Sequence, residues 1–187
     1  MSWIKDKWRY LLAQMLREKA PVEFIARGWA IGMFYGCTIP FGFQLLLSVP
    51  TAVLLKGSKV GATLGTFITN HFTIFLIYPM QFWLGNRMLE LFGAHVTPVS
   101  TMMEELKHVG SFMIWTSDFW QALGQMVEKD GGATLASFFL GGFLLAAVTV
   151  PLTYIGVFRY VRAHRARKEG KRRARATTGS MREAQEA

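Results

Sequence analysis

The chain has 187 residues, enough for one modest domain, and hydrophobic side chains make up 51% of it. They are grouped, because the runs 28–55, 60–86 and 131–158 contain no Asp, Glu, Lys or Arg. Each run exceeds the roughly 20 apolar residues that a helix needs to cross a membrane. A soluble protein would rarely contain three such runs. The composition therefore argues against a soluble protein and predicts an integral membrane protein.

The net charge of +9 lies at the two ends of the chain: segment 1–27 carries +3, segment 159–187 carries +7, and the residues between them carry −1. Because Lys and Arg are retained on the cytoplasmic side, both termini are predicted to face the cytoplasm of a bacterial inner membrane. Two cytoplasmic termini require an even number of crossings, so one of the three runs must fail to cross or cross twice.

We therefore expect an all-α membrane protein, with broken or re-entrant helices, spanning helices and surface amphipathic helices. Five segments are predicted: an amphipathic cytoplasmic-surface helix at 1–27, a broken-helix membrane core at 28–92, an outer-surface amphipathic segment at 93–130, a transmembrane helix at 131–160 and a basic cytoplasmic tail at 161–187.

The first segment places apolar side chains on one helical face, from Ile4 and Trp8 to Met15. This pattern is typical of a helix that lies on a membrane surface with Trp at headgroup depth. A groove on a soluble partner is the alternative.

The first run is interrupted at its centre by Pro40 and Gly42. Proline removes a backbone donor and clashes with the preceding turn, while glycine permits unusual backbone angles. We expect two half-helices, near 25–38 and 42–55, that dip into the membrane and return. A kinked helix that spans the membrane is the alternative.

The second run is interrupted by polar residues around Asn70 and His71, which need partners at membrane depth. We expect the two breaks to meet in the protein interior. The predicted polar membrane site comprises Gln44, Thr66, Asn70, His71, Thr73 and Tyr78.

Small residues recur every four positions before each break, at Gly28, Gly32 and Gly36 and then at Gly61 and Gly65. Residues at this spacing share a helix face and let membrane helices approach closely. The two ladders indicate a weak internal repeat. They suit helix packing in general, and they also suit a transporter core made of broken helices.

At IPFGFQ and ITNHFT the sequence resembles an uncharacterised bacterial membrane-protein family, known as a domain of unknown function. That family has a Pro-x-Pro-Phe-Gln motif, which Pro40, Phe43 and Gln44 match, and an Asn-Pro-x-Thr motif, which Asn70 and Thr73 match. The positions that depart from these motifs are Gly42 and His71. Some members are joined to glycosyltransferases, which implies an envelope or lipid-linked-sugar setting.

The segment from Trp115 to Met126 has an aromatic and aliphatic face that suits either the outer membrane surface or a partner. The basic tail suits anionic lipid headgroups better than nucleic acid, because it directly follows a membrane helix. The lone Cys37 lies in an apolar run and reads as a small core residue rather than a reactive thiol.

The sequence contains no arrangement typical of a catalytic nucleophile, a phosphate loop or a metal site, so we expect neither an enzyme nor a cofactor. The first hypothesis is a small protein that handles or transports a lipid-linked or anionic solute, with Arg27 and Arg87 contacting headgroups. The alternative is a non-transporting scaffold or subunit of an envelope or other membrane complex. Expected partners are anionic lipids, further copies of the chain or other membrane subunits.

Overall fold

The structure is a computed structural model that describes residues 20–40, 43–67, 73–93 and 132–186, together with position 18 and scattered positions between 96 and 128. The described part contains helices and no strand, as expected for an all-α fold. The helices are α2 (Val22–Thr38), α3 (Phe43–Leu54), α4 (Lys59–Thr66), α5 (Ile74–Leu91) and α8 (Ala133–Glu186). Most of the expected surface helix at 1–27 (residues 1–17 and 19), most of 93–130, and the predicted site residues Gly42, Asn70 and His71 lie outside the described residues.

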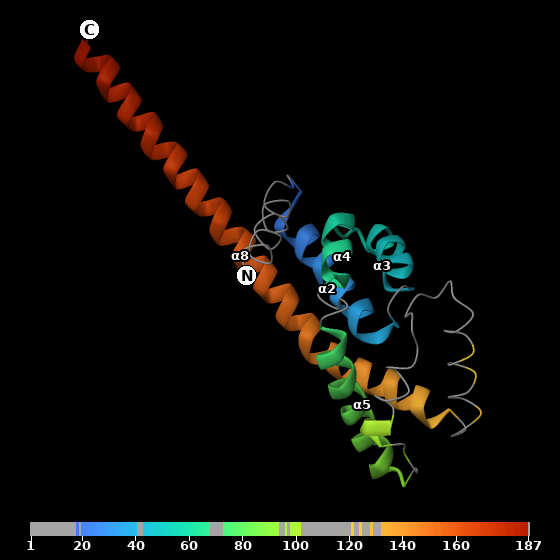
Figure 1. Cartoon of the computed structure of the whole chain (residues 1–187). Helices are drawn as coiled ribbons and strands as arrows, with labels where there is room; N and C mark the ends of the chain where they lie inside the picture. The colour runs from blue at the N-terminus through green and yellow to red at the C-terminus, as the bar shows by residue number, and fades with distance from the viewer. Residues whose placement is uncertain are drawn as a thin grey trace.

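Helices α2 and α5 both pack against the long helix α8 (Figure 1). Both helices run antiparallel to it. On α2, Cys37 lies beside Thr149, and Ile25 packs in one cluster with Val161. Helix α5 packs closer to the N-terminal end of α8, where Gly85 lies against Ser137.

The first apolar run folds as an antiparallel hairpin of α2 and α3, interrupted next to Pro40. The hydroxyl groups of Tyr35 and Thr51 are 2.8 Å apart across the hairpin. At its open end, the Ser58 backbone N–H donates to the Phe24 carbonyl at 2.9 Å. The end of α3 therefore returns to the start of α2.

The expected junction between a surface segment at 1–27 and a membrane core at 28 lies inside a helix. Helix α2 begins at Val22, directly after Pro21, and continues through it. Proline suits the position just before a helix, because it has no N–H that would lose a partner there. A change in charge along the sequence predicts a change of surroundings, and it does not by itself end a helix.

The two glycine ladders pack on each other. Helix α4 runs parallel to α2, with Gly28 against the Ser58 backbone and Gly32 against that of Ala62. A Cβ added at Gly65 would lie 2.7 Å from the Trp29 carbonyl oxygen and 2.9 Å from the Gly32 Cα. No side chain fits between the two backbones at this crossing, which is the close approach that small residues at four-residue spacing allow.

The third run and the basic tail form one continuous helix, so the expected junction at 160/161 lies inside a helix. The tail is rich in Ala, Arg and Lys, which are strong helix formers, and this explains why the helix continues. The Nη2 atom of Arg165 donates to the carbonyl oxygens of Glu18 at 2.7 Å and Ala20 at 2.8 Å. This contact joins α8 to the segment that precedes α2.

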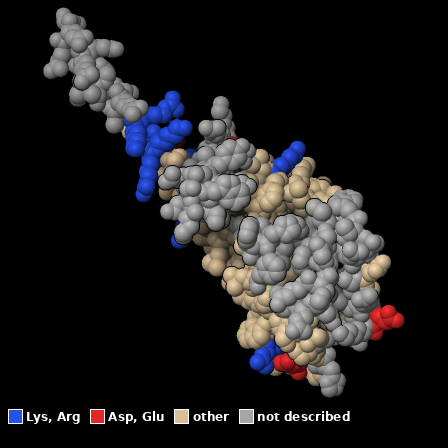
Figure 2. Space-filling view, in the orientation of Figure 1, with Lys and Arg blue, Asp and Glu red and all other residues tan. Residues whose placement is uncertain are grey.

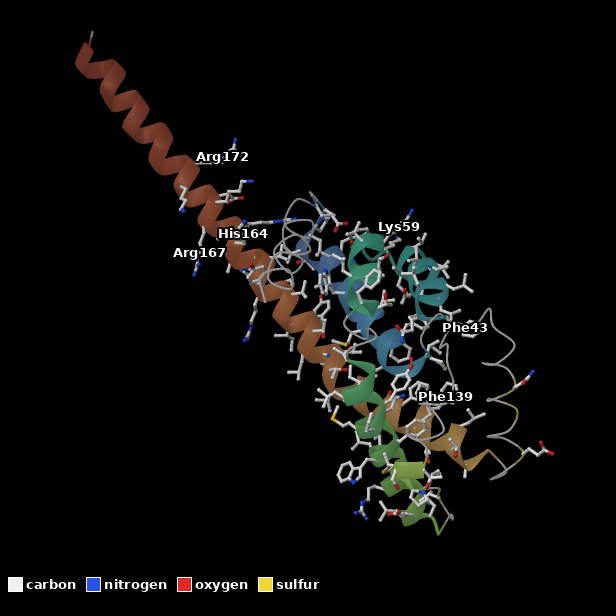
Figure 3. All side chains as sticks on the ribbon, in the orientation of Figure 1. Phe43, Lys59, Phe139, His164, Arg167 and Arg172 are labelled. Carbon is white, nitrogen blue, oxygen red and sulfur yellow. The ribbon has the colours of Figure 1, made fainter. Side chains whose placement is uncertain are left out.

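Basic side chains gather toward one end of the molecule on the face that Figure 2 shows. Lys59, at the start of α4, lies at the same end as His164 and Arg167 of α8 (Figure 3). Arg27 belongs to this end too, because its Nη1 atom donates to the Leu55 carbonyl at 3.4 Å. A second charged group lies near the C-terminal end of α5. It is the Arg87–Glu90 pair, with an N···O distance of 3.2 Å.

Candidate functional site

Four helix ends lie beside the middle of α8, in two staggered pairs. The end of α2 lies beside Gly142, because a Cβ added there would lie 3.2 Å from the Thr38 Cα. Gly141 lies against Gln81, so the start of α5, about two turns earlier, lies about two turns farther along α8, near Val148. Phe43, where α3 begins, lies between the levels of Lys59 and Phe139 in Figure 3. Helix α4 ends beside α2, one residue after Gly65.

Gln44 closes the break between α2 and α3. Its buried Nε2 donates to the carbonyl oxygen of Ile39 at 2.9 Å and to that of Gly36 at 3.4 Å. The last carbonyls of a helix have no partner within the helix. The Gln44 side chain supplies one from the next helix, and its amide donors are therefore engaged with the backbone.

The other described members of the predicted polar site lie at or near the ends of α4 and α5, and each has a different environment. The Thr66 hydroxyl donates to the Thr63 carbonyl of its own helix at 2.7 Å. Thr73 precedes the first residue of α5. Tyr78 is buried in an aromatic cluster with Phe82 and Phe138, and its ring meets that of Phe138 edge-on at 5.2 Å.

The two predicted headgroup contacts are not brought together. Arg27 lies at the open end of the α2–α3 hairpin, and Arg87 lies on α5 at the opposite end of the fold. The Arg87 guanidinium also lies 5.8 Å from the centre of the Trp83 ring. Any role for these arginines therefore concerns two different ends of the molecule.

A buried polar seam between α5 and α8 lies outside the site residues that the sequence predicts. It comprises Gln81 and Asn86 of α5 with Thr134 and Ser137 of α8, all of them buried. Gln81 Nε2 donates to the Phe138 carbonyl at 2.9 Å. Within the described structure, the Oε1 atom of Gln81 and the Oγ atom of Ser137 have no hydrogen-bond partner.

The seam adjoins the helix ends through Gly142. A Cβ added there would lie 2.6 Å from the Cys37 carbonyl oxygen and 2.7 Å from Gln81 Nε2. The sequence carries a signal for this crossing, because Gly85 and Gln81, and likewise Gly141 and Ser137, are four residues apart. It is the same spacing that reveals the α2–α4 ladders.

Among the described residues, the chemistry available at this junction is uncharged. Hydroxyls, carboxamides and helix-end carbonyls line it, and the described residues contain no group of three His, Cys, Asp or Glu side chains that could hold a metal ion. Such groups can exchange hydrogen bonds with a solute, but they offer no described nucleophile paired with a base.

The fold and the site define an all-helical protein organised on one long helix, with interrupted helices that meet beside it. By length and composition, one helix in the described part, within Ala133–Arg172, is long and apolar enough to cross a membrane. The chain belongs to the family described as "Uncharacterized protein conserved in bacteria (DUF2062)", whose model matches residues 5–170. No curated protein and no solved structure matches the chain.

Proposed function

We propose that this protein resides in the bacterial inner membrane and handles or transports a lipid-linked or anionic solute at the junction of its helix ends. The observation that carries the proposal is that two helix C-termini, of α2 and α4, and two helix N-termini, of α3 and α5, lie within about two turns of one another beside the middle of the apolar part of α8. Paired interrupted helices that meet near the bilayer midplane are the pattern of transporter binding sites.

The dimensions of the helices support a membrane setting. The uncharged part of α8, residues 133–158, has a length of about 39 Å at 1.5 Å per residue, enough to cross a core of roughly 30 Å with some tilt. Residues 28–38 of α2 have a length of about 16 Å, about half of that thickness.

These lengths favour a definite topology. The α2–α3 hairpin enters from the basic side and returns, while α4 and α5 together make one crossing and α8 makes the second. The basic residues Arg27, Lys56 and Lys59 then lie on the same side as the positive extension of α8, in agreement with retention of Lys and Arg in the cytoplasm.

A non-transporting scaffold or subunit is the second candidate, and one observation favours it. The Gln44 amide donates to backbone carbonyls at the end of α2, and the Thr66 hydroxyl donates to a carbonyl of its own helix. Both contacts are expected if these side chains only satisfy the backbone at the helix breaks. In that case the exposed apolar faces of α3 and α8 would contact other subunits as well as lipid.

Transport in vesicles separates the two candidates. We expect that the purified chain, reconstituted in phosphatidylcholine vesicles, speeds the movement of fluorescently labelled glycolipid or phosphatidylglycerol between leaflets, measured by dithionite quenching. We expect Asn70→Ala to slow this movement without lowering the yield of folded protein. A wild-type rate equal to that of protein-free vesicles for both lipids, with purification in a defined complex, would instead support the scaffold.

A further inference from the structure

The α5–α8 seam has an unusual composition for a helix crossing in apolar surroundings. Gln81 and Ser137 are each 0% exposed, yet the Gln81 Oε1 and Ser137 Oγ atoms have no partner among the described residues. An unsatisfied polar atom in such a place is costly, because neither hydrocarbon nor an apolar core offers it a hydrogen bond. Each such atom calls for an explanation beyond packing.

The position of these two atoms in the fold suggests an explanation. Gln81 lies beside Gly142, at the level where α2 ends, and Ser137 lies about one turn farther toward the Arg87 end of the fold, against Gly85. Asn86 and Thr134 continue the buried polar row in the same direction. The row therefore leads from the junction of helix ends to the end of the molecule opposite the basic extension.

Helix α5 can leave this contact without disturbing the rest of the core. Among the described helices it packs extensively on α8 only, whereas α2, α3 and α4 pack on one another. A shift of α5 away from α8 would expose the polar row. It would leave the tight α2–α4 crossing at Gly32 and Gly65 intact.

We infer that the α5–α8 seam is the outer half of the solute path, and that it accepts an uncharged, hydroxyl-bearing headgroup such as a sugar. The inference rests on the proposed function and narrows its substrate class. An orphaned carboxamide oxygen accepts hydrogen bonds, and the Ser137 hydroxyl can accept as well as donate, so a ligand rich in hydroxyl donors satisfies both. The polar row contains no cation that would balance the charge of a buried phosphate.

The test uses the whole chain in phosphatidylcholine vesicles that contain either a fluorescently labelled glucosyl diacylglycerol or labelled phosphatidylglycerol. The wild-type chain should move the glucosyl lipid faster than phosphatidylglycerol. Ser137→Ala should raise the thermal unfolding temperature, because an unsatisfied buried hydroxyl is removed at nearly constant shape. It should also slow the glucosyl lipid by roughly three- to tenfold, the contribution of one neutral hydrogen bond.

The matched control is Ser48→Ala. Ser48 is equally buried but lies on α3, where its hydroxyl is 3.5 Å from the Leu45 carbonyl of its own helix. It should leave the transport rate unchanged, while Gln81→Met should slow the glucosyl lipid as Ser137→Ala does.

Three results would count against the inference. If Ser137→Ala raises the unfolding temperature and leaves the rate unchanged, the orphaned hydroxyl is only a packing defect. If wild-type protein moves phosphatidylglycerol as fast as the glucosyl lipid, the path does not select hydroxyl donors, although the proposed function stands. If neither lipid moves, the proposed function fails and the inference fails with it.

Discussion

Replacing Gly32 with valine should strongly destabilise the α2–α4 pair. A Cβ at this position would lie 2.8 Å from the Gly65 Cα and still closer to the Ala62 carbonyl oxygen. Both obstacles are backbone atoms, so no side-chain rotation relieves the overlap and the two helices must separate. Overpacking typically costs about 1–3 kcal/mol, and here we expect the upper end of this range or more. The measurement is thermal unfolding of the purified chain in detergent.

Gly156→Val is the matched control for Gly32→Val. Gly156 also lies in an apolar part of a helix, but nothing lies within 4 Å of a Cβ added to it. Valine there should leave the unfolding temperature unchanged or slightly higher, because glycine is a poor helix former. Equal loss of stability in both variants would mean that the close α2–α4 contact does not hold the core together.

Replacing Gln44 with methionine should produce the second large effect. The change nearly preserves side-chain volume but removes the donor to the part-buried Ile39 carbonyl at 2.9 Å and the longer contact to the Gly36 carbonyl at 3.4 Å. Loss of the donor to an acceptor inside the protein costs about 1–3 kcal/mol, and we expect a loss in this range. Hydrogen exchange should also show earlier opening of the last turn of α2.

The control for Gln44→Met is Leu46→Met, in the same helix at a side chain that is 63% exposed. It should change neither the unfolding temperature nor the exchange of α2. If Gln44→Met were as stable as the wild type but slow in lipid movement, Gln44 would act on the solute, and its bonds to the helix end would be incidental.

Much of the core could be predicted from local sequence signals. Pro40 marks the end of α2 because proline cannot continue the backbone ladder, and the expected half-helices lie within a few residues of α2 and α3. The ladders at Gly32 and Gly65 are visible in the sequence because residues four apart share a face. Pro50 and Pro79 follow the two ladders at matching positions inside α3 and α5, which extends the repeat beyond the glycines.

The partners of the polar residues could not be predicted, because they depend on which helices meet. The sequence shows that Gln44 is polar in an apolar run, but not that it caps α2 from the next helix. Tyr78 could equally have faced the polar junction, and it packs with Phe82 and Phe138 instead. The partner of Gln81, the Phe138 carbonyl, lies in a distant run and cannot be predicted from the residues around Gln81.

The continuous α8 shows a different limit. The change from apolar to basic residues near Arg159 predicts a change of environment, and α8 continues through it. Helix formation depends on backbone propensity, and Ala, Arg and Lys favour the helix as strongly as leucine does. A change of solvent along a helix therefore need not coincide with its end.

The central claim is that the α2–α3 hairpin enters and leaves one face of the membrane, and cysteine labelling tests it most directly. In a Cys37→Ser background, single cysteines would replace Lys56, Phe92 and Arg172, all exposed positions, with Phe92 81% exposed. Intact cells would be treated with a membrane-impermeant maleimide. The account predicts labelling of Phe92→Cys alone, and of all three after permeabilisation. Labelling of Lys56→Cys but not of Arg172→Cys in intact cells would mean that the first run simply crosses, and would contradict the account.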